Sequence, residues 1–164
     1  MNSPTLFALS FAIFGMSTRV LVFALDWESS VSTQLYFLFL LLAIFFGMRA
    51  SFLQNPQRTF GQLFKVGARA SATFALVVSA FTYVFYKWFD PNYFAGLIAA
   101  RIDEAKSLGY PEDQLENVTA TSQVIFSLSM HIPLTLIGFT LLGISYSVIV
   151  ALIFKKVPMM KKGF

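Results

Sequence analysis

The segment RASFLQNPQRTFGQLFKVGAR, residues 49–69, carries four basic residues and no acidic one. The bases are Arg49, Arg58, Lys65 and Arg69. A long apolar stretch lies on each side of the segment, and each is close to the roughly 20 residues that a helix needs to cross a bilayer. The segment therefore predicts a basic connection between two transmembrane helices.

Apolar stretches of this length occur four times in the 164 residues. They predict helices over about residues 5–25, 31–48, 66–86 and 124–154. Hydrophobic residues make up 57% of the chain and charged residues only 12%, which is too few to cover the surface of a soluble domain. We therefore expect an all-α membrane protein with four transmembrane helices in a single domain, residues 1–164.

The distribution of charge predicts an orientation in the membrane. Four lysines follow the last apolar stretch with no acid among them: Lys155, Lys156, Lys161 and Lys162. All eight acidic residues lie in the other two connections. Because Lys and Arg bias short loops towards the cytoplasm, we expect segment 49–69 and both chain termini to be cytoplasmic.

The outer connection, residues 90–123, is predicted to be helical and amphipathic. Apolar residues such as Tyr93 and Leu97 recur there at helical spacing, and Gly109 provides a stop. A second, shorter helix is expected to start near Pro111 and to run into the last span. This segment either lies on the outer membrane surface, where it caps the bundle, or binds a partner.

Small residues recur every four positions in the third predicted span. They are Gly67, Ser71, Ala75 and Ser79. In a membrane, such a face lets a neighbouring helix approach closely, so that van der Waals packing holds the two helices together. The sequence therefore predicts a helix-packing face. The neighbouring helix belongs either to the same chain or to a second copy.

Two residues, Arg19 and His131, are candidates for a polar site within the bundle. A charge inside the hydrocarbon is costly and indicates function by default. Arg19 lies near enough to the outer end of its span to reach the interface beside Asp26, but small residues on its helix face suggest that it points inward. His131 precedes Pro133, and an imidazole beside a kinked helix suits proton transfer or pH sensing. The expected depth of His131 in the membrane instead favours a hydrogen-bonded histidine at the outer interface.

The sequence contains no pattern typical of catalysis. Cysteine is absent and there is one histidine, which excludes a thiol nucleophile and any site built from several His or Cys ligands. No predicted span contains a carboxylate, and no phosphate-binding Gly-rich loop or nucleophile elbow is present. We therefore expect no catalytic residue, no cofactor, no metal and no enzymatic activity. The net charge is +4, but the basic residues flank apolar helices, which disfavours nucleic acid as a partner.

Three motifs resemble those of a known family. They are FGMR at residues 46–49, TFGQLFKVG at residues 59–67 and an aromatic exit from the third span at residues 83–94. Over nearly its whole length the chain resembles a Bacteroidetes family of small four-helix membrane proteins that is known only as a domain of unknown function. The resemblance implies a four-span fold in a bacterial inner membrane, and it carries over no catalytic residue.

These features lead to two functional hypotheses. The first is a non-enzymatic accessory or scaffold subunit, which contacts another membrane protein or a second copy of itself through the small-residue face and the outer helix. The second is a lipid-handling or transport protein that holds an anionic headgroup, such as a polyprenyl phosphate, on the cytoplasmic face. In the second hypothesis the candidate contacts are Arg49, Arg58, Phe60, Phe64, Lys65 and Arg69. Membrane lipids are expected partners in both.

Overall fold

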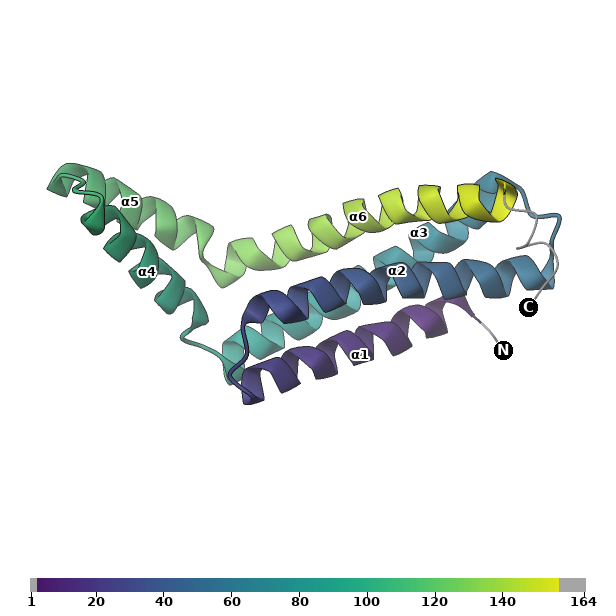
Figure 1. Ribbon diagram of the computed structural model, residues 1–164, viewed down its shortest axis with the longest axis horizontal. Coiled ribbons are helices and arrows are strands. Elements are labelled where there is room, and N and C mark those ends of the chain that lie inside the picture. Colours follow the sequence, from purple (N-terminus) through teal and green to yellow (C-terminus); the bar gives the residue numbers. More distant parts are fainter. Residues whose placement is uncertain (1–2, 157–164) are drawn as a thin grey trace. The chain divides into compact units, whose positions relative to one another are not determined.

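The computed structural model describes residues 3–156, and the regular elements in this range are all helices (Figure 1). They are α1 (Pro4–Ala24), α2 (Ser29–Gln54), α3 (Phe60–Val84), the π-helix η1 (Phe85–Phe89), α4 (Tyr93–Ser107), α5 (Glu112–Ile125) and α6 (Leu128–Lys156). Within this range, four stretches are long and apolar enough to cross a membrane: α1, α2, α3 together with η1, and α6. The predicted fold class, all-α with four candidate transmembrane helices, is confirmed. Lys161 and Lys162 lie outside the described residues.

The chain forms two compact units, each of which is described by itself. The first consists of α1, α2, the greater part of α3 up to residue 78, and α6 from residue 136. The second covers residues 79–135 and contains η1, α4, α5 and the adjoining ends of α3 and α6. The basic segment therefore belongs to the first unit and the predicted outer segment to the second.

Aromatic side chains from three helices form the centre of the first unit. Helices α1 and α2 also lie side by side in this unit (Figure 1). The Tyr36 ring of α2 lies 6.5 Å from Phe74 of α3 and 5.9 Å from Phe139 of α6, measured between ring centroids. Phe74 and Phe139 are themselves 5.7 Å apart. All three pairs meet edge to face, an arrangement that adds about 0.5–1.5 kcal/mol per pair beyond simple burial. The three rings thus tie α2, α3 and α6 together.

Helices α3 and α6 approach closely where Ser71 faces Gly143. A Cβ atom at Gly143 would overlap the Ser71 hydroxyl, so only glycine fits this position. Ser71 is almost completely buried, and its hydroxyl donates a hydrogen bond to the Phe139 backbone carbonyl at 3.4 Å. A hydroxyl that is bonded in this way adds polar attraction to the van der Waals packing of small residues.

A second close approach lies one turn away along α3, at Gly67. A Cβ atom there would lie 2.6 Å from Ser147 Oγ of α6 and would overlap Met48 of α2. Ala75 is fully buried and Ser79 is buried as well. The face that the sequence predicted for close packing, from Gly67 to Ala75, therefore contacts helices of the same chain.

The basic segment is more helical than the sequence predicted. Helix α2 continues to Gln54 rather than residue 48, and α3 begins at Phe60 rather than residue 66. Thr59 and Gln62 start α3 with a capping box: the Thr59 N–H donates to Gln62 Oε1 at 2.9 Å and the Gln62 N–H donates to Thr59 Oγ1 at 3.3 Å. Only residues 55–59, which include the helix-stopping Pro56, connect the two helices.

In the second unit, α4 and α5 form an antiparallel hairpin (Figure 1). The turn depends on Gly109, which has a φ of +77° that side chains rarely adopt. The Gly109 N–H bonds to the Lys106 carbonyl at 3.0 Å and the Tyr110 N–H bonds to the Ala105 carbonyl at 3.2 Å, which closes the end of α4. The stop predicted at Gly109 is thus the turn of the hairpin.

The second outer helix was expected to run into the last span, but α5 ends at Ile125 and α6 begins at Leu128. Ser127 lies between them, and its side chain forms hydrogen bonds with the end of α5 and with the start of α6. Its hydroxyl donates to the Val124 carbonyl at 2.8 Å, and the same oxygen accepts the Met130 N–H at 3.3 Å.

The π-helix η1, which no pattern in the sequence predicted, follows α3 directly. The Asp90 N–H bonds to the Phe85 carbonyl five residues earlier, at 3.1 Å. Asp90 ends η1, and α4 starts three residues later at Tyr93. Each turn of a π-helix contains more residues than a turn of α-helix, and such turns occur often at functional sites.

The contact between Ser71 and Gly143 gives a stability prediction. Gly143→Ala should lower the free energy of unfolding by about 1–3 kcal/mol, because the added methyl group overpacks the junction of α3 and α6. Gly138→Ala is the matched control on the same helix, since a Cβ atom there meets nothing within 4 Å. Thermal unfolding of the purified protein in detergent checks both variants. Equal melting temperatures for the two would contradict the proposed close packing.

Candidate functional site

Basic side chains line a pocket in the first unit, near the connection between α2 and α3. The pocket has a volume of about 220 Å³. Its lining residues, referred to below as the basic pocket, are Pro4, Arg58, Gln62, Lys65, Val66 and Arg69. Three of the four bases of the segment that opened the sequence analysis therefore lie around one cavity.

The local structure explains why these residues meet. Lys65 and Val66 lie three and four residues after Gln62 and four and three residues before Arg69, which places all four on one face of α3. Arg58 lies before the helix and is held in place because its Nε donates to the Ser51 carbonyl at 3.2 Å. This hydrogen bond uses an N–H of the guanidinium group but leaves its two terminal amino groups available for a ligand.

The electrostatics of the basic pocket favour an anion. It is lined by three positive side chains and by no acidic residue. The pocket also lies at the start of α3, where the helix dipole adds positive potential. Pro4 is the first residue of α1, so a second helix begins at the same cavity. Ser3 already binds the first N–H groups of α1, and this helix therefore contributes a field rather than hydrogen bonds.

Three of the six predicted lipid or partner contacts do not line the basic pocket. Arg49 is half-buried elsewhere on α2, and Phe60 and Phe64 stack on each other with ring centroids 6.3 Å apart. Gln62 and Val66 were not predicted from the sequence, although they share a face with Lys65 and Arg69 on a helix that begins at Phe60. Local spacing could not indicate Pro4, which comes from a distant part of the chain.

Arg19 is buried within the first unit, with only 7% of its surface exposed. Its Nη1 donates to the Ser32 hydroxyl of α2 at 3.4 Å, and Ser32 in turn donates to the Ser29 carbonyl at 2.8 Å. The Arg19 side chain therefore points into the bundle and not towards the interface beside Asp26, which is exposed. A charged donor in this position fixes α1 against α2, because a buried cation requires polar partners.

His131 lies in the second unit among aromatic side chains. Its ring centroid is 5.5 Å from Tyr86 of η1 and 5.3 Å from Phe94 of α4. Tyr86 also stacks on Tyr93 with a centroid distance of 4.6 Å. The π-helix, α4 and the start of α6 therefore meet at His131. Since Arg19 belongs to the other unit, a site shared by Arg19 and His131 stays a prediction.

No group of three or more His, Asp or Glu side chains in residues 3–156 could hold a metal ion. Three of the sequence-predicted site residues, Arg58, Lys65 and Arg69, come together at the basic pocket. Its chemistry, fixed positive charge with an amide and two apolar side chains, is suited to binding an anion that carries an apolar group.

The ring contacts of His131 give a second prediction. His131→Phe should keep most of the stability of the wild-type protein, whereas His131→Ala should lose about 1–3 kcal/mol, because each edge-to-face contact contributes about 0.5–1.5 kcal/mol. Thermal unfolding in detergent measures both, with Met130→Ala at the exposed neighbouring position as control. If His131→Phe is as damaging as His131→Ala, hydrogen bonding by the imidazole outweighs its packing.

Comparison with known proteins assigns the chain to a family. No curated protein and no solved structure matches it. The family model described as "Protein of unknown function (DUF4199)" matches residues 6–156. This range includes the basic pocket apart from Pro4, the aromatic surroundings of His131 and nearly all of the four candidate spans. The protein, with its four candidate transmembrane helices, therefore belongs to the DUF4199 family, whose function is unknown.

Proposed function

We propose that the protein binds the anionic headgroup of a membrane lipid in the basic pocket. The observation that carries this proposal is the convergence of Arg58, Lys65 and Arg69 on one cavity whose lining contains no acid. Positive charges held close together repel one another, so an anion placed between them is attracted by all three at once.

The pocket suits a phosphate group in particular. The free edge of the Arg58 guanidinium can donate two parallel hydrogen bonds to phosphate oxygens, whereas Lys65 and Arg69 supply further charge. Val66 and Pro4 provide an apolar wall for the part of the lipid next to the phosphate. A polyprenyl phosphate and a glycerophospholipid both combine these two properties.

In this proposal the basic pocket lies at the cytoplasmic face of a bacterial inner membrane, and both chain termini are cytoplasmic. The positive charge of the segment supports this orientation, because Lys and Arg are retained on the cytoplasmic side. The junction of two spans is also the depth at which lipid phosphates lie, and juxtamembrane basic residues bind anionic lipids there.

The proposed function is binding without catalysis. Neither a carboxylate nor an imidazole lines the basic pocket, and its positive side chains suit the binding of an anion. We propose accordingly that the protein is not an enzyme and that it retains or passes on an anionic lipid.

A role as an accessory subunit is the second candidate, and the hairpin of α4 and α5 favours it. Gly67 and Ser71 pack against the chain's own helices, so the small-residue face is occupied. At the hairpin turn, however, Leu108 is 64% exposed and Tyr110 is 42% exposed. Apolar side chains that project from a turn are suited to contact with another membrane protein.

Removing charge from the basic pocket tests the lipid proposal. The double variant Lys65→Gln/Arg69→Gln should bind farnesyl phosphate about 30-fold more weakly than wild type, since each juxtamembrane base contributes about 1 kcal/mol. Farnesol has the same tail without the phosphate and should bind equally weakly to both proteins. Native mass spectrometry of the detergent-solubilised protein measures the occupancies.

The double variant Arg49→Gln/Lys155→Gln is the matched control for this experiment. It removes the same number of positive charges from the same predicted face, but from residues that do not line the basic pocket. Its affinity for farnesyl phosphate should stay within about threefold of wild type. Equal losses in the two double variants would show a nonspecific charge effect and would overturn the proposal.

The accessory-subunit candidate is tested by copurification. Extracted in a mild detergent from cells that express it at native level, the chain should be recovered with a second membrane protein. Leu108→Ser/Tyr110→Ser should abolish that association without changing the amount of folded protein, because both side chains are exposed. Recovery of the wild-type chain only as a monomer would argue against this role.

A further inference from the structure

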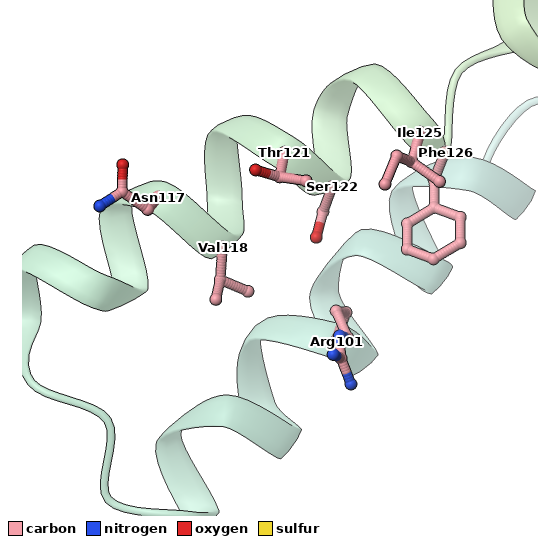
Figure 2. Close-up of a pocket in the computed structure, with 7 residues that line it drawn as sticks. All are labelled: Arg101, Asn117, Val118, Thr121, Ser122, Ile125 and Phe126. Carbon is pink, nitrogen blue, oxygen red and sulfur yellow. The ribbon is translucent and has the colours of Figure 1, made fainter.

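A second and larger pocket lies between α4 and α5 in the second unit. Its volume is about 530 Å³, which is within the range of small-molecule binding sites. Figure 2 shows the seven residues that line this α4–α5 groove: Arg101, Asn117, Val118, Thr121, Ser122, Ile125 and Phe126. None of the seven is among the individual site residues predicted from the sequence, although five of them belong to the predicted outer segment, residues 90–123.

The lining of the α4–α5 groove changes from polar to apolar along α5. Asn117 lies at one end, and Ile125 and Phe126 lie at the other, where α5 leads into the candidate span α6. Val118 and Ser122, one turn apart, point from α5 towards α4 (Figure 2). The groove therefore offers an apolar surface at its membrane-proximal end and hydrogen-bonding groups further away.

Arg101 is the one charged residue in the lining of the groove. Its Nη1 forms an ion pair with Glu104 one turn along α4, and both side chains are about half exposed. An exposed pair of this kind contributes little to stability. A negatively charged ligand in the groove can therefore displace Glu104 at small cost.

Ser122 provides independent support for a ligand. Its residue surface is only 4% exposed, yet it lines the groove, and its oxygen is directed into the space between the two helices (Figure 2). Among the residues that the structure describes, its hydroxyl makes no hydrogen bond. The Ser122 oxygen itself stays accessible through the groove, so a ligand oxygen placed there can accept a hydrogen bond from the hydroxyl.

We propose that the α4–α5 groove binds a single-chain amphiphile with an anionic head. Arg101 pairs with the head, the Ser122 hydroxyl donates to one of its oxygens, and the tail lies along Val118, Ile125 and Phe126. The tail is required for binding. Acids on the hairpin, such as Glu112, Asp113 and Glu116, repel any anion, and burial of the tail offsets this repulsion.

Photocrosslinking tests this inference with the full-length protein in phosphatidylcholine nanodiscs. A diazirine-bearing twelve-carbon fatty acid should label peptides that contain residues 117–126. Laurate and dodecyl phosphate, which share the tail and carry different anionic heads, should both compete. Dodecanol, which has the tail without the charge, and inorganic phosphate, which has the charge without the tail, should not. Competition by dodecanol equal to that by laurate would overturn the role of Arg101.

Variants on one helix make the test specific. Arg101→Gln should weaken laurate binding about tenfold, because it removes a charge-assisted hydrogen bond. Lys106→Gln is the matched control, since Lys106 lies on the same helix, pairs with Asp103 and does not line the groove. Val118→Trp should block labelling by filling the groove while Arg101 remains. Unchanged laurate binding by Arg101→Gln, or an equal loss in Lys106→Gln, would overturn the inference.

The inference is independent of the proposed function, and the same assay separates the two. Lys65→Gln/Arg69→Gln should leave labelling of residues 117–126 unchanged. If labelling instead depends on Lys65 and Arg69 and not on Arg101, the amphiphile binds the basic pocket. That result would overturn the inference and support the proposed function.

Discussion

The close approach of α3 and α6 is the constraint on which the first unit depends. Ser71 against Gly143 and Ser147 against Gly67 leave no room for a single additional carbon atom. In a membrane, lipid tails are as apolar as the side chains, so helices are held by such close packing and by hydrogen bonds between them. Ser71 contributes in both ways, because it packs against Gly143 and its hydroxyl donates a hydrogen bond to the Phe139 carbonyl.

This packing also determines where the basic pocket forms. Because Gly67 and Ser71 face α6 and α2, the face of α3 that carries Lys65 and Arg69 must lie to one side of the contact. The capping box at Thr59 then fixes where α3 begins, and hence how far its bases lie from Arg58. A structural feature of the helix start thereby positions the charges that we propose bind a phosphate.

Much of this fold could be predicted from hydropathy, since the length of each apolar stretch directly reflects the thickness of a bilayer. Lys65, Arg69 and Arg58 could be selected as candidates because they lie in one short connection that carries four bases and no acid. Hydropathy does not define helix ends, however, and Gln54 and Phe60 extend α2 and α3 well into a polar segment. Pro4 and the α4–α5 groove depend on tertiary contacts, which no local pattern encodes.

The π-helix at the end of α3 has a consequence for how the sequence can change. A turn with hydrogen bonds to the fifth residue holds one residue more than an α-helical turn. Deletion of one residue between Phe85 and Phe89 would let the segment revert to an α-helix without loss of a hydrogen bond. The residues of η1 that follow the deletion would then be rotated by about 100° around the helix axis relative to α3, which would change the direction in which the chain continues towards Phe94 beside His131. Relatives that differ in length at this point are therefore expected to differ in the aromatic cluster as well.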